Sequence, residues 1–309
     1  MRDGTEQQTE TKRIETDELI VRRLHPLVAA EVLGLDLREP PVPPLIATIE
    51  RLVDEFAVLV IRDQRLDDEQ HIALSRAFGP LELPPDYGTG APKRLRRELY
   101  DASNLGTDGQ VLPEDSPRRE YNKANYTFHH DSTFNHPPSK WSLLLSHVIP
   151  PAGGETEFVD TRLVYEDLPA AVKLRIDGLS AIHDLWHSHR EGGYFKVTDD
   201  MRRRMPPVRQ PIVRKLTDGR KAFCIGSHAT HVEGWPQTEG RVLLDELYVF
   251  ATQPKYIYRH PWRQGDLIIW DNRTALHRAR PWDDQGQIRD LRRTSINEYG
   301  PEVAATDPR

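Results

Sequence analysis

The spacing of apolar residues predicts where the main helices lie. Over residues 45–56 apolar side chains recur every three or four positions, and two prolines stand just before them, which predicts an amphipathic helix. Residues 238–250 show similar spacing, and residues 163–176 show it with a break at a proline. Asp67 and Gln70 have the spacing of a capping box, which predicts the start of a further helix.

Strand-like segments outnumber these helices. Four segments read as strands by composition: Ala57–Ile61, Trp141–Ile149, Asp266–Trp270 and Arg293–Tyr299. Residues 211–225 predict a hairpin around an Asp218-Gly219 turn. Many strands with sparse helices favour a mainly β fold with flanking helices, arranged as a jelly-roll barrel with the helices packed outside.

The chain is expected to form one domain. Its 309 residues suffice for a substantial core, strand-like segments are scattered from residue 19 to residue 299, and no repeat interrupts them. We therefore expect a single domain over residues 19–309. Residues 1–18 are polar and charged, which predicts a disordered N-terminal tail. Residues 83–125 are rich in Pro, Gly and Asp and predict long loops with short strands.

Charge and cysteine content narrow the class of protein. The net charge of −6 gives no electrostatic reason to expect a nucleic-acid partner. Acidic residues surround the two basic runs, 93–97 and 202–204, which favours a solvated face or an anion-binding loop. Cys224 is the one cysteine, which fits a reducing, cytoplasmic compartment. No apolar run is long enough to cross a membrane.

The chemistry is indicated by His129-His130-Asp131, followed far downstream by His277. Side chains alternate along a strand, so His129 and Asp131 would share one face while His130 points away and bonds outside any metal sphere. Together with one imidazole from a distant strand, they would make a 2-His-1-carboxylate facial triad. Such a triad leaves half of the coordination sphere of a metal open. A His-x-Asp alone is a weak signal, so the surrounding motifs decide.

Several longer motifs accompany this set: Phe78–Glu82, Gly153–Phe158, Ile225–Gly234, Gly265–Arg273 and Arg289–Ile296. With them the chain resembles the TauD/TfdA family of 2-oxoglutarate-dependent dioxygenases, and within it the 2,4-dichlorophenoxyacetate dioxygenase branch. The resemblance runs over nearly the whole chain after the tail. It implies a double-stranded β-helix, an Fe(II) ion held by His129, Asp131 and His277, and the co-substrates 2-oxoglutarate and O2.

The resemblance also implies where 2-oxoglutarate binds. Arg293 would pair with its distal carboxylate, because a guanidinium fork matches a carboxylate bidentately. Thr156 would donate its hydroxyl to the same carboxylate. Arg289 lies four residues before Arg293 and would share its face if the strand begins that early, close to the carboxylate of the co-substrate or of the substrate.

The substrate implied is a small molecule bearing a carboxylate or sulfonate. Candidate substrate-binding residues are Lys93, Arg94, Asn104, His228, His231 and Arg278. The chain departs from the phenoxyacetate-cleaving pattern after Gly79-Pro80, where residues 82–86 replace a lysine-bearing segment. Hydroxylation, with or without ether cleavage, is therefore expected alongside desaturation or ring formation as alternatives.

The sequence leaves alternative functions open. An inactive jelly-roll binding module would not need the complete triad, and a zinc hydrolase would not need Arg293. His183, His187 and His189 cluster in one region, but no carboxylate spacing accompanies them, which favours positions on the surface or at a pocket rim. The helix over residues 238–250 would serve the core or a contact in a homo-oligomer.

Overall fold

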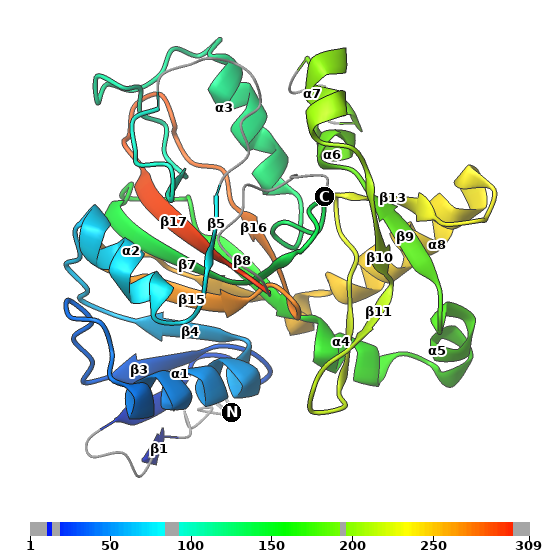
Figure 1. Cartoon of the computed structure of the whole chain (residues 1–309), viewed down its shortest axis with the longest axis horizontal. Helices are drawn as coiled ribbons and strands as arrows, with labels where there is room; N and C mark the ends of the chain where they lie inside the picture. The colour runs from blue at the N-terminus through cyan, green and yellow to red at the C-terminus, as the bar shows by residue number, and fades with distance from the viewer. Residues whose placement is uncertain (1–10, 14–18, 84–92, 192–195, 299–309) are drawn as a thin grey trace, which may run out of the picture.

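The computed structural model describes residues 11–13, 19–83, 93–191 and 196–298. Its largest sheet has nine strands: β1 (Thr11–Arg13), β2 (Ile20–Arg23), β3 (Ala30–Leu33), β4 (Val58–Ile61), β5 (Leu81–Glu82), β6 (Tyr100–Asp101), β7 (Ser139–Val148), β15 (Leu267–Asp271) and β17 (Asp290–Asn297). They follow the order β1-β2-β3-β4-β15-β7-β17-β5, and β6 also pairs with β17 (Figure 1). The pairing is antiparallel except between β3 and β4.

Three smaller sheets complete the β structure. One has the order β14-β8-β16 and contains β8 (Thr156–Asp160), β14 (Tyr258–His260) and β16 (Ala275–Ala279). Another has the order β10-β9-β13 and contains β9 (Ser180–His183), β10 (Val208–Pro211) and β13 (Ala229–Val232). The third is the predicted hairpin, β11 (Val213–Lys215) with β12 (Lys221–Phe223).

Helices flank these sheets. The α-helices are α1 (Pro43–Phe56), α2 (Asp68–Arg76), α3 (Pro117–Asn122), α4 (Thr161–Asp167), α5 (Ala170–Ile176), α6 (Leu185–Glu191), α7 (Asp199–Arg204) and α8 (Gln237–Ala251); two 3-10 helices are η1 (Lys123–Tyr126) and η2 (Pro254–Tyr256). In Figure 1, α1 and α2 lie with the large sheet, whereas α5 to α8 lie with β9, β10 and β13 on the opposite side. The prediction of a mainly β fold with flanking helices is confirmed.

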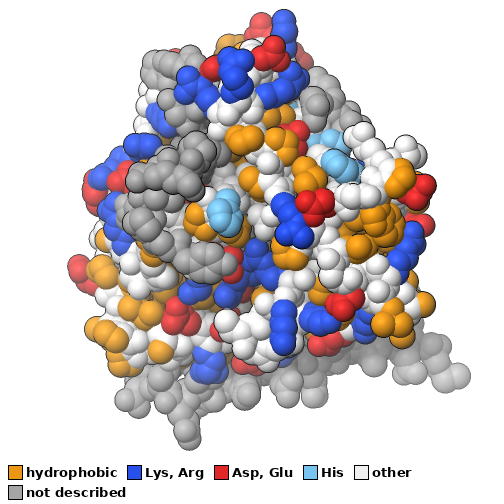
Figure 2. Space-filling model, turned by 45° about the vertical axis from the view of Figure 1, so that its right-hand side comes forward, with side chains coloured by type: hydrophobic (Ala, Val, Ile, Leu, Met, Phe, Trp, Pro, Cys, Tyr) orange, Lys and Arg blue, Asp and Glu red, His pale blue; other side chains and the backbone are white. Residues whose placement is uncertain are grey.

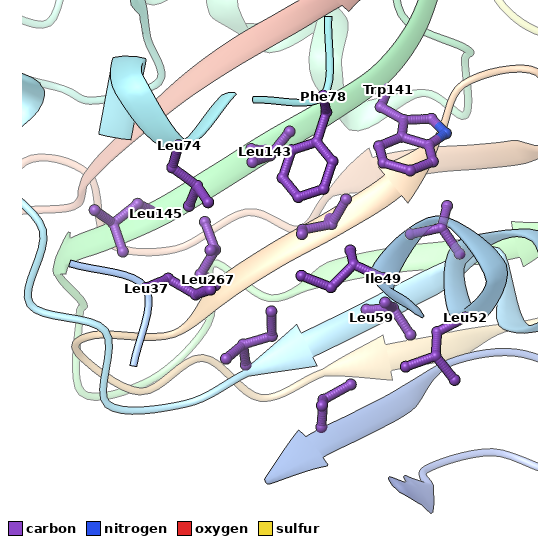
Figure 3. Packing of buried hydrophobic residues seen from close by; sticks show 14 of the residues in the cluster. Leu37, Ile49, Leu52, Leu59, Leu74, Phe78, Trp141, Leu143, Leu145 and Leu267 are labelled. Atoms are coloured by element: carbon purple, nitrogen blue, oxygen red, sulfur yellow. The ribbon is translucent and has the colours of Figure 1, made fainter. Parts of the chain in front are cut away.

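Side-chain alternation along β15 explains how the large sheet is buried on both faces. Leu267 and Ile269 pack with α1 and α2 in one apolar cluster (Figure 3). Ile268 and Trp270 point the other way, into a second cluster with Phe158 of β8 and other residues of the smaller sheet. Each fully buried Leu or Ile contributes about 1.5–3 kcal/mol relative to an exposed one, so this two-sided packing fixes β15 firmly.

Local sequence patterns predicted the positions of several helices correctly. Asp67 and Gln70 form the predicted capping box at the start of α2. The helical stretch 163–176 divides into α4 and α5 near its proline, as expected. The helices expected over 45–56 and 238–250 are α1 and α8. Cys224 is buried, directly after β12.

Of two predictions about segments before β7, one was wrong and the other incomplete. The alternation around the His-x-Asp indicated a strand, but η1 precedes it, His129 makes only an isolated bridge, and a turn begins at Asp131. The stretch 83–125 was expected to hold long loops with short strands; it contains the short strand β6, but also α3 and the start of η1, and residues 84–92 lie outside the described ranges. The expected tail, 1–18, also lies mostly outside them, although Thr11–Arg13 form β1.

Surface charge is mixed. Figure 2 shows acidic and basic side chains interspersed over the visible face rather than gathered into one basic patch. With the net charge of −6, this gives that face no electrostatic footprint for nucleic acid. Among the described residues, the structure has no helix that is both long and apolar enough to span a membrane.

Candidate active site

Three buried potential ligands, His129, Asp131 and His277, lie close together. The Oδ1 atom of Asp131 lies 3.9 Å from His129 Nε2 and 3.7 Å from His277 Nε2. All three ligand atoms lie within 4.8 Å of one another, close enough for a single ion to contact each of them. Backbone pairing creates this convergence, because His129 and His277 exchange two hydrogen bonds, of 3.0 and 2.9 Å, across an isolated antiparallel bridge.

The two imidazoles are held in a metal-binding form. His129 Nδ1 lies 2.8 Å from the carbonyl oxygen of Thr127, and donation to that oxygen leaves Nε2 free to bind a metal. Burial lowers the pKa of both His129 and His277, which keeps the rings neutral. Neutral imidazole is the form that binds a metal, so these two side chains fit an Fe(II) ion.

Asp131 is ionised despite being buried. Burial alone would raise the pKa of this carboxyl, but the Arg293 guanidinium and the hydrogen bond from Ser142 hold the pKa well below its usual range. Arg293 also donates a hydrogen bond from Nη1 to Asp131 Oδ1. Two neutral imidazoles and one carboxylate form the set of ligands that suits ferrous iron better than a closed structural zinc site.

A chain of hydrogen bonds orients the Asp131 carboxylate from behind. Ser142 of β7 donates its hydroxyl to Asp131 Oδ2 at 2.8 Å. Asn272 donates from Nδ2 to Ser142 Oγ at 2.8 Å and to Ser139 Oγ at 2.9 Å, and accepts from Trp270 Nε1 at 2.7 Å. The predicted position of His130 outside the triad is confirmed, since its Nδ1 lies 3.0 Å from the Asn272 carbonyl oxygen.

A pocket opens beside the triad. It is lined by Glu82, Glu98, Tyr100, Tyr121, Ala124, Asn125, His129, Asp131, Ser132, Phe134, Leu185, His189, His228, Arg293 and Ser295. One predicted substrate residue, His228, is in this wall, and its ring meets those of His129 and Phe134 edge-on. The guanidinium of Arg293 lies 4.6 Å from the centre of the Tyr100 ring. The wall therefore combines ionic groups with aromatic rings.

Arg289 and Arg293 lie in different surroundings. A register irregularity at Asp290 in β17 interrupts simple alternation between the two arginines. Arg289 is 4% exposed and donates to the carbonyl oxygens of Gly154, at 3.2 Å, and Ala102, at 3.3 Å. Burial lowers the pKa of Arg289 to about 10. Among the described residues no carboxylate forms an ion pair with it, so that part of the chain leaves its buried charge without an anionic partner.

Thr156 lies close to the same segment as Arg289. It is the first residue of β8 and is 3% exposed, two positions after Gly154, whose carbonyl oxygen accepts from Arg289. Its hydroxyl accepts a hydrogen bond from Trp262 Nε1 at 3.0 Å, which leaves the hydroxyl proton available to a further acceptor. Thr156 and Arg289 therefore flank one stretch of backbone.

The remaining predicted substrate residues lie outside the pocket wall. Lys93 is exposed. Each of the others has a partner in the protein: Arg94 pairs with Asp101 and Asp290, Asn104 donates to the backbone at Asp284 and Gln287, His231 bonds to Thr230, and Arg278 pairs with Glu157. A substrate role for these five stays a prediction that the pocket geometry does not support.

Of the three clustered histidines, only one lines the pocket. His189 of α6 stacks on Tyr121 of α3, with ring centres 4.3 Å apart. His183 is fully buried beside Thr133 Oγ1, so the expectation of a surface or rim position is wrong for it. Among the described residues, the triad is the one group of three or more potential metal ligands that lie close together.

Sequence reasoning missed several pocket and support residues. Glu82, Tyr100, Ser142 and Asn272 received no role, yet all contact the site or its supporting hydrogen bonds. A signal existed for Ser142, a polar residue inside the apolar run of β7. No comparable signal marks Tyr100, because it lies in a loop-rich stretch without periodicity.

Similarity to known proteins covers most of the chain. The family model described as "Taurine catabolism dioxygenase TauD, TfdA family" matches residues 20–295. The chain is 44% identical over 279 residues to an alpha-ketoglutarate-dependent 2,4-dichlorophenoxyacetate dioxygenase of Cupriavidus pinatubonensis, covering 90% of this chain and 97% of the relative. It is 35% identical to a (S)-phenoxypropionate/alpha-ketoglutarate-dioxygenase of Sphingobium herbicidovorans, covering 74% of this chain and 78% of that protein.

Solved structures are also similar to this chain over most of its length. The crystal structure of AAD-2 in complex with Mn(II) and N-oxalylglycine superposes with a TM-score of 0.86 at 38% identity, covering 92% of this chain and 99% of that chain. A putative alpha-ketoglutarate dependent 2,4-D dioxygenase from Burkholderia xenovorans gives a TM-score of 0.77 at 34% identity, with 91% and 98% covered.

Proposed function

The chain belongs to the TauD/TfdA family of Fe(II)- and 2-oxoglutarate-dependent dioxygenases, and from this premise we propose that it oxidises a small organic acid. The observation that carries the proposal is the convergence of His129, Asp131 and His277 beside a pocket that also contains Arg293. An intact set of ligands beside a pocket that contains Arg293 argues against an inactive binding module. Arg293 in that pocket also argues against a zinc hydrolase, which would not need it.

The three ligands would hold Fe(II) through His129 Nε2, His277 Nε2 and Asp131 Oδ1. When bound, the metal would supply the oxidation by O2 in which 2-oxoglutarate is converted to succinate and CO2. The residues of the chain then have three tasks: they orient the ligands, bind the two acids and keep water from the reacting carbon. Ser142 and Asn272 perform the first task through the hydrogen bonds behind Asp131.

The two arginines would divide the binding of the acids. 2-Oxoglutarate carries a carboxylate at each end, so the group that anchors its distal end must lie away from the metal. Arg293 touches the metal ligand Asp131 itself, whereas Arg289 has an uncompensated charge beside Gly154 and near Thr156. We therefore assign the distal carboxylate to Arg289 with Thr156, and we assign to Arg293 an acidic group near the metal. The expectation from the sequence was different: it gave the distal carboxylate to Arg293 and placed Arg289 near the carboxylate of either the co-substrate or the substrate.

The substrate would be a carboxylic acid held by Arg293, with His228 beside it. Both residues line the pocket, and aromatic side chains of Tyr121 and Phe134 form part of its wall. Relatives named for phenoxyacetate and phenoxypropionate oxidation favour an aryloxy acid. Hydroxylation of the carbon next to the ether oxygen would give a hemiacetal that collapses, which would cleave the ether. A sulfonate would meet the same arginine and remains in the screen below.

The fold would be the double-stranded β-helix that the family implies. The supporting observation is that β15 and β7 of the large sheet and β8 and β16 of the small sheet share one apolar cluster, which includes Leu144, Phe158 and Trp270. Two antiparallel sheets packed on a common core are the basic arrangement of a jelly roll.

The test is a succinate-release screen with Fe(II) and 2-oxoglutarate over small carboxylates and sulfonates, including aryloxyacetates. At least one acid should increase succinate release well above the substrate-free rate. His129→Ala should abolish that release, whereas the matched control His231→Ala, which removes an imidazole outside the pocket, should retain it. Succinate release that survives His129→Ala, or that never requires iron, would reject the proposed function.

A further inference from the structure

Glu82 is a buried carboxylate in the pocket wall that the proposed chemistry does not use. It is the second residue of the two-residue strand β5 and pairs with Ser295 of β17. It is 6% exposed and lines the pocket together with Asp131 and Arg293. Burying a carboxylate costs free energy unless hydrogen bonds or a partner charge compensate for it, so the partners of Glu82 indicate its role.

One oxygen of Glu82 holds the segment that directly follows the metal ligand Asp131. Glu82 Oε1 accepts a hydrogen bond from Ser132 Oγ at 2.8 Å and another from Asn135 Nδ2 at 3.0 Å. The backbone of Asn135 also donates to the carbonyl oxygen of Ser132 at 3.0 Å, which closes a turn. A single carboxylate oxygen therefore ties together both ends of this turn.

The turn needs such support because Ser132 has a left-handed backbone conformation, with φ of +56°. Residues other than glycine are strained there and keep that conformation only when surrounding contacts impose it. The carboxylate of Asp131 is attached one residue earlier, so its direction depends on this backbone. Ser142 and Arg293 each hold one oxygen of this carboxylate, and neither bond fixes the chain that follows.

We propose that Glu82 is a positioning residue for the metal site, which clamps Ser132 and Asn135 and thereby directs the Asp131 carboxylate toward His129 and His277. The inference relies on the proposed function in taking Asp131 as a metal ligand. Glu82 contributes to metal affinity and does not contact the ion or the substrate. Removing a residue that orients a metal ligand typically weakens metal binding by about ten- to a hundredfold.

The surroundings of Glu82 agree with a carboxyl group kept for its acceptor oxygen. Burial raises the pKa of Glu82 to about 7, against the opposing effects of Ser132 and Arg293. Its other oxygen, Oε2, is buried and has no hydrogen-bond partner within the described part of the chain. Oε1 thus carries both hydrogen bonds, and an amide oxygen in the same place could accept them equally well.

The experiment measures Mn(II) affinity of the purified full chain by isothermal titration calorimetry, with thermal unfolding of each variant as a check of folding. Glu82→Met keeps the length of the side chain but removes the acceptor, and should weaken Mn(II) binding about tenfold. Glu82→Gln keeps an acceptor oxygen and should stay within about twofold of the unmodified chain. Unchanged affinity in a folded Glu82→Met variant would overturn the inference.

A second substitution distinguishes positioning from general damage. Glycine adopts a positive φ without strain, so adding Ser132→Gly to Glu82→Met should recover a large part of the lost affinity. No recovery would contradict the role of the clamp. If Glu82→Met fails to fold, Asn135→Ala removes the other hydrogen bond of the clamp and should also weaken Mn(II) binding; unchanged binding there would reject the inference.

The Asp131→Ala variant distinguishes this inference from the proposed function. Mn(II) binding that is unchanged in Asp131→Ala would overturn the metal site itself. Binding that is lost in Asp131→Ala but unaffected by Glu82→Met would leave the proposed function in place and reject only the role of Glu82.

Discussion

Replacing Arg289 by methionine is the sharpest test of how 2-oxoglutarate binds. Arg289 is buried, donates only to backbone carbonyl oxygens, and forms no ion pair with a carboxylate of the described residues. A dicarboxylate co-substrate would supply the missing charge. Two hydrogen bonds to a charged group contribute about 1.5 kcal/mol each at the low end of the usual range, or about 3 kcal/mol together. Because 1.4 kcal/mol corresponds to a factor of ten, affinity should fall roughly a hundredfold.

The assay follows succinate release against 2-oxoglutarate concentration at saturating substrate. Arg289→Met should raise the KM for 2-oxoglutarate by roughly two orders of magnitude, and kcat at saturation should change less. The variant should fold normally, because removing an unpaired buried cation also removes its desolvation cost. A KM within twofold of the unmodified enzyme would refute the assignment of the distal carboxylate to Arg289.

Arg94 provides the matched control. It is also a partly buried arginine, but it pairs with both Asp101 and Asp290, at 2.8 and 2.6 Å. Arg94→Met should leave those carboxylates partly uncompensated and lower the free energy of unfolding by about 3 kcal/mol. The KM for 2-oxoglutarate should stay unchanged. Arg289→Met should therefore change binding but not stability, and Arg94→Met should change stability but not binding. Denaturant unfolding together with the kinetic assay distinguishes these two outcomes.

Three further outcomes follow from the geometry. Thr156→Val removes the hydroxyl that accepts from Trp262 and should raise the KM for 2-oxoglutarate roughly tenfold, measured in the same assay. Asn272→Ala removes the donor to Ser142 and should weaken Mn(II) binding about tenfold by calorimetry. Burial lowers the pKa of His71 to about 4, so as pH falls from 6.5 to 4 this imidazole is protonated in the unfolded chain but not in the folded one. The contribution of His71 to stability should therefore fall by about 3 kcal/mol over that window, and urea unfolding should show a smaller loss for His71→Gln than for the unmodified chain.

Much of the fold could be predicted because burial leaves a local pattern in the sequence. The apolar spacing of α1 and α8 and the capping box of α2 each reflect contacts within one element. The segment before the triad misled the same reasoning. The alternation there comes from two metal ligands that flank His130, and a turn with a left-handed Ser132 replaces the strand. Alternation indicates a strand only when side-chain burial, rather than chemistry, produces it.

The triad was predictable for a different reason. The His-x-Asp and the distant histidine occur together with several motifs of a known family, and in that combination they have few other roles. The predicted convergence of His129 and His277 is reached through backbone bonding between them rather than through a long strand. Glu82, in contrast, lies in a segment that the sequence links to the family and to the choice of substrate, not to the metal site. Its function depends on hydrogen bonds to Ser132 and Asn135, about fifty residues away in the chain, which no local pattern encodes.

The arginines show why sequence alone assigned substrate residues poorly. Arg94, Arg278, Arg289 and Arg293 were all candidate anion ligands, the first two for the substrate, since a sequence shows the charge but not its partner. Folding neutralises Arg94 with two aspartates and Arg278 with Glu157, which leaves these two little electrostatic reason to bind a further acid. Arg289 alone among the four has no carboxylate partner within the described residues, while Arg293 faces the pocket against a metal ligand. A buried cation whose charge the protein leaves unbalanced is maintained at an energetic cost, and a ligand that brings the balancing charge gains that cost as binding energy.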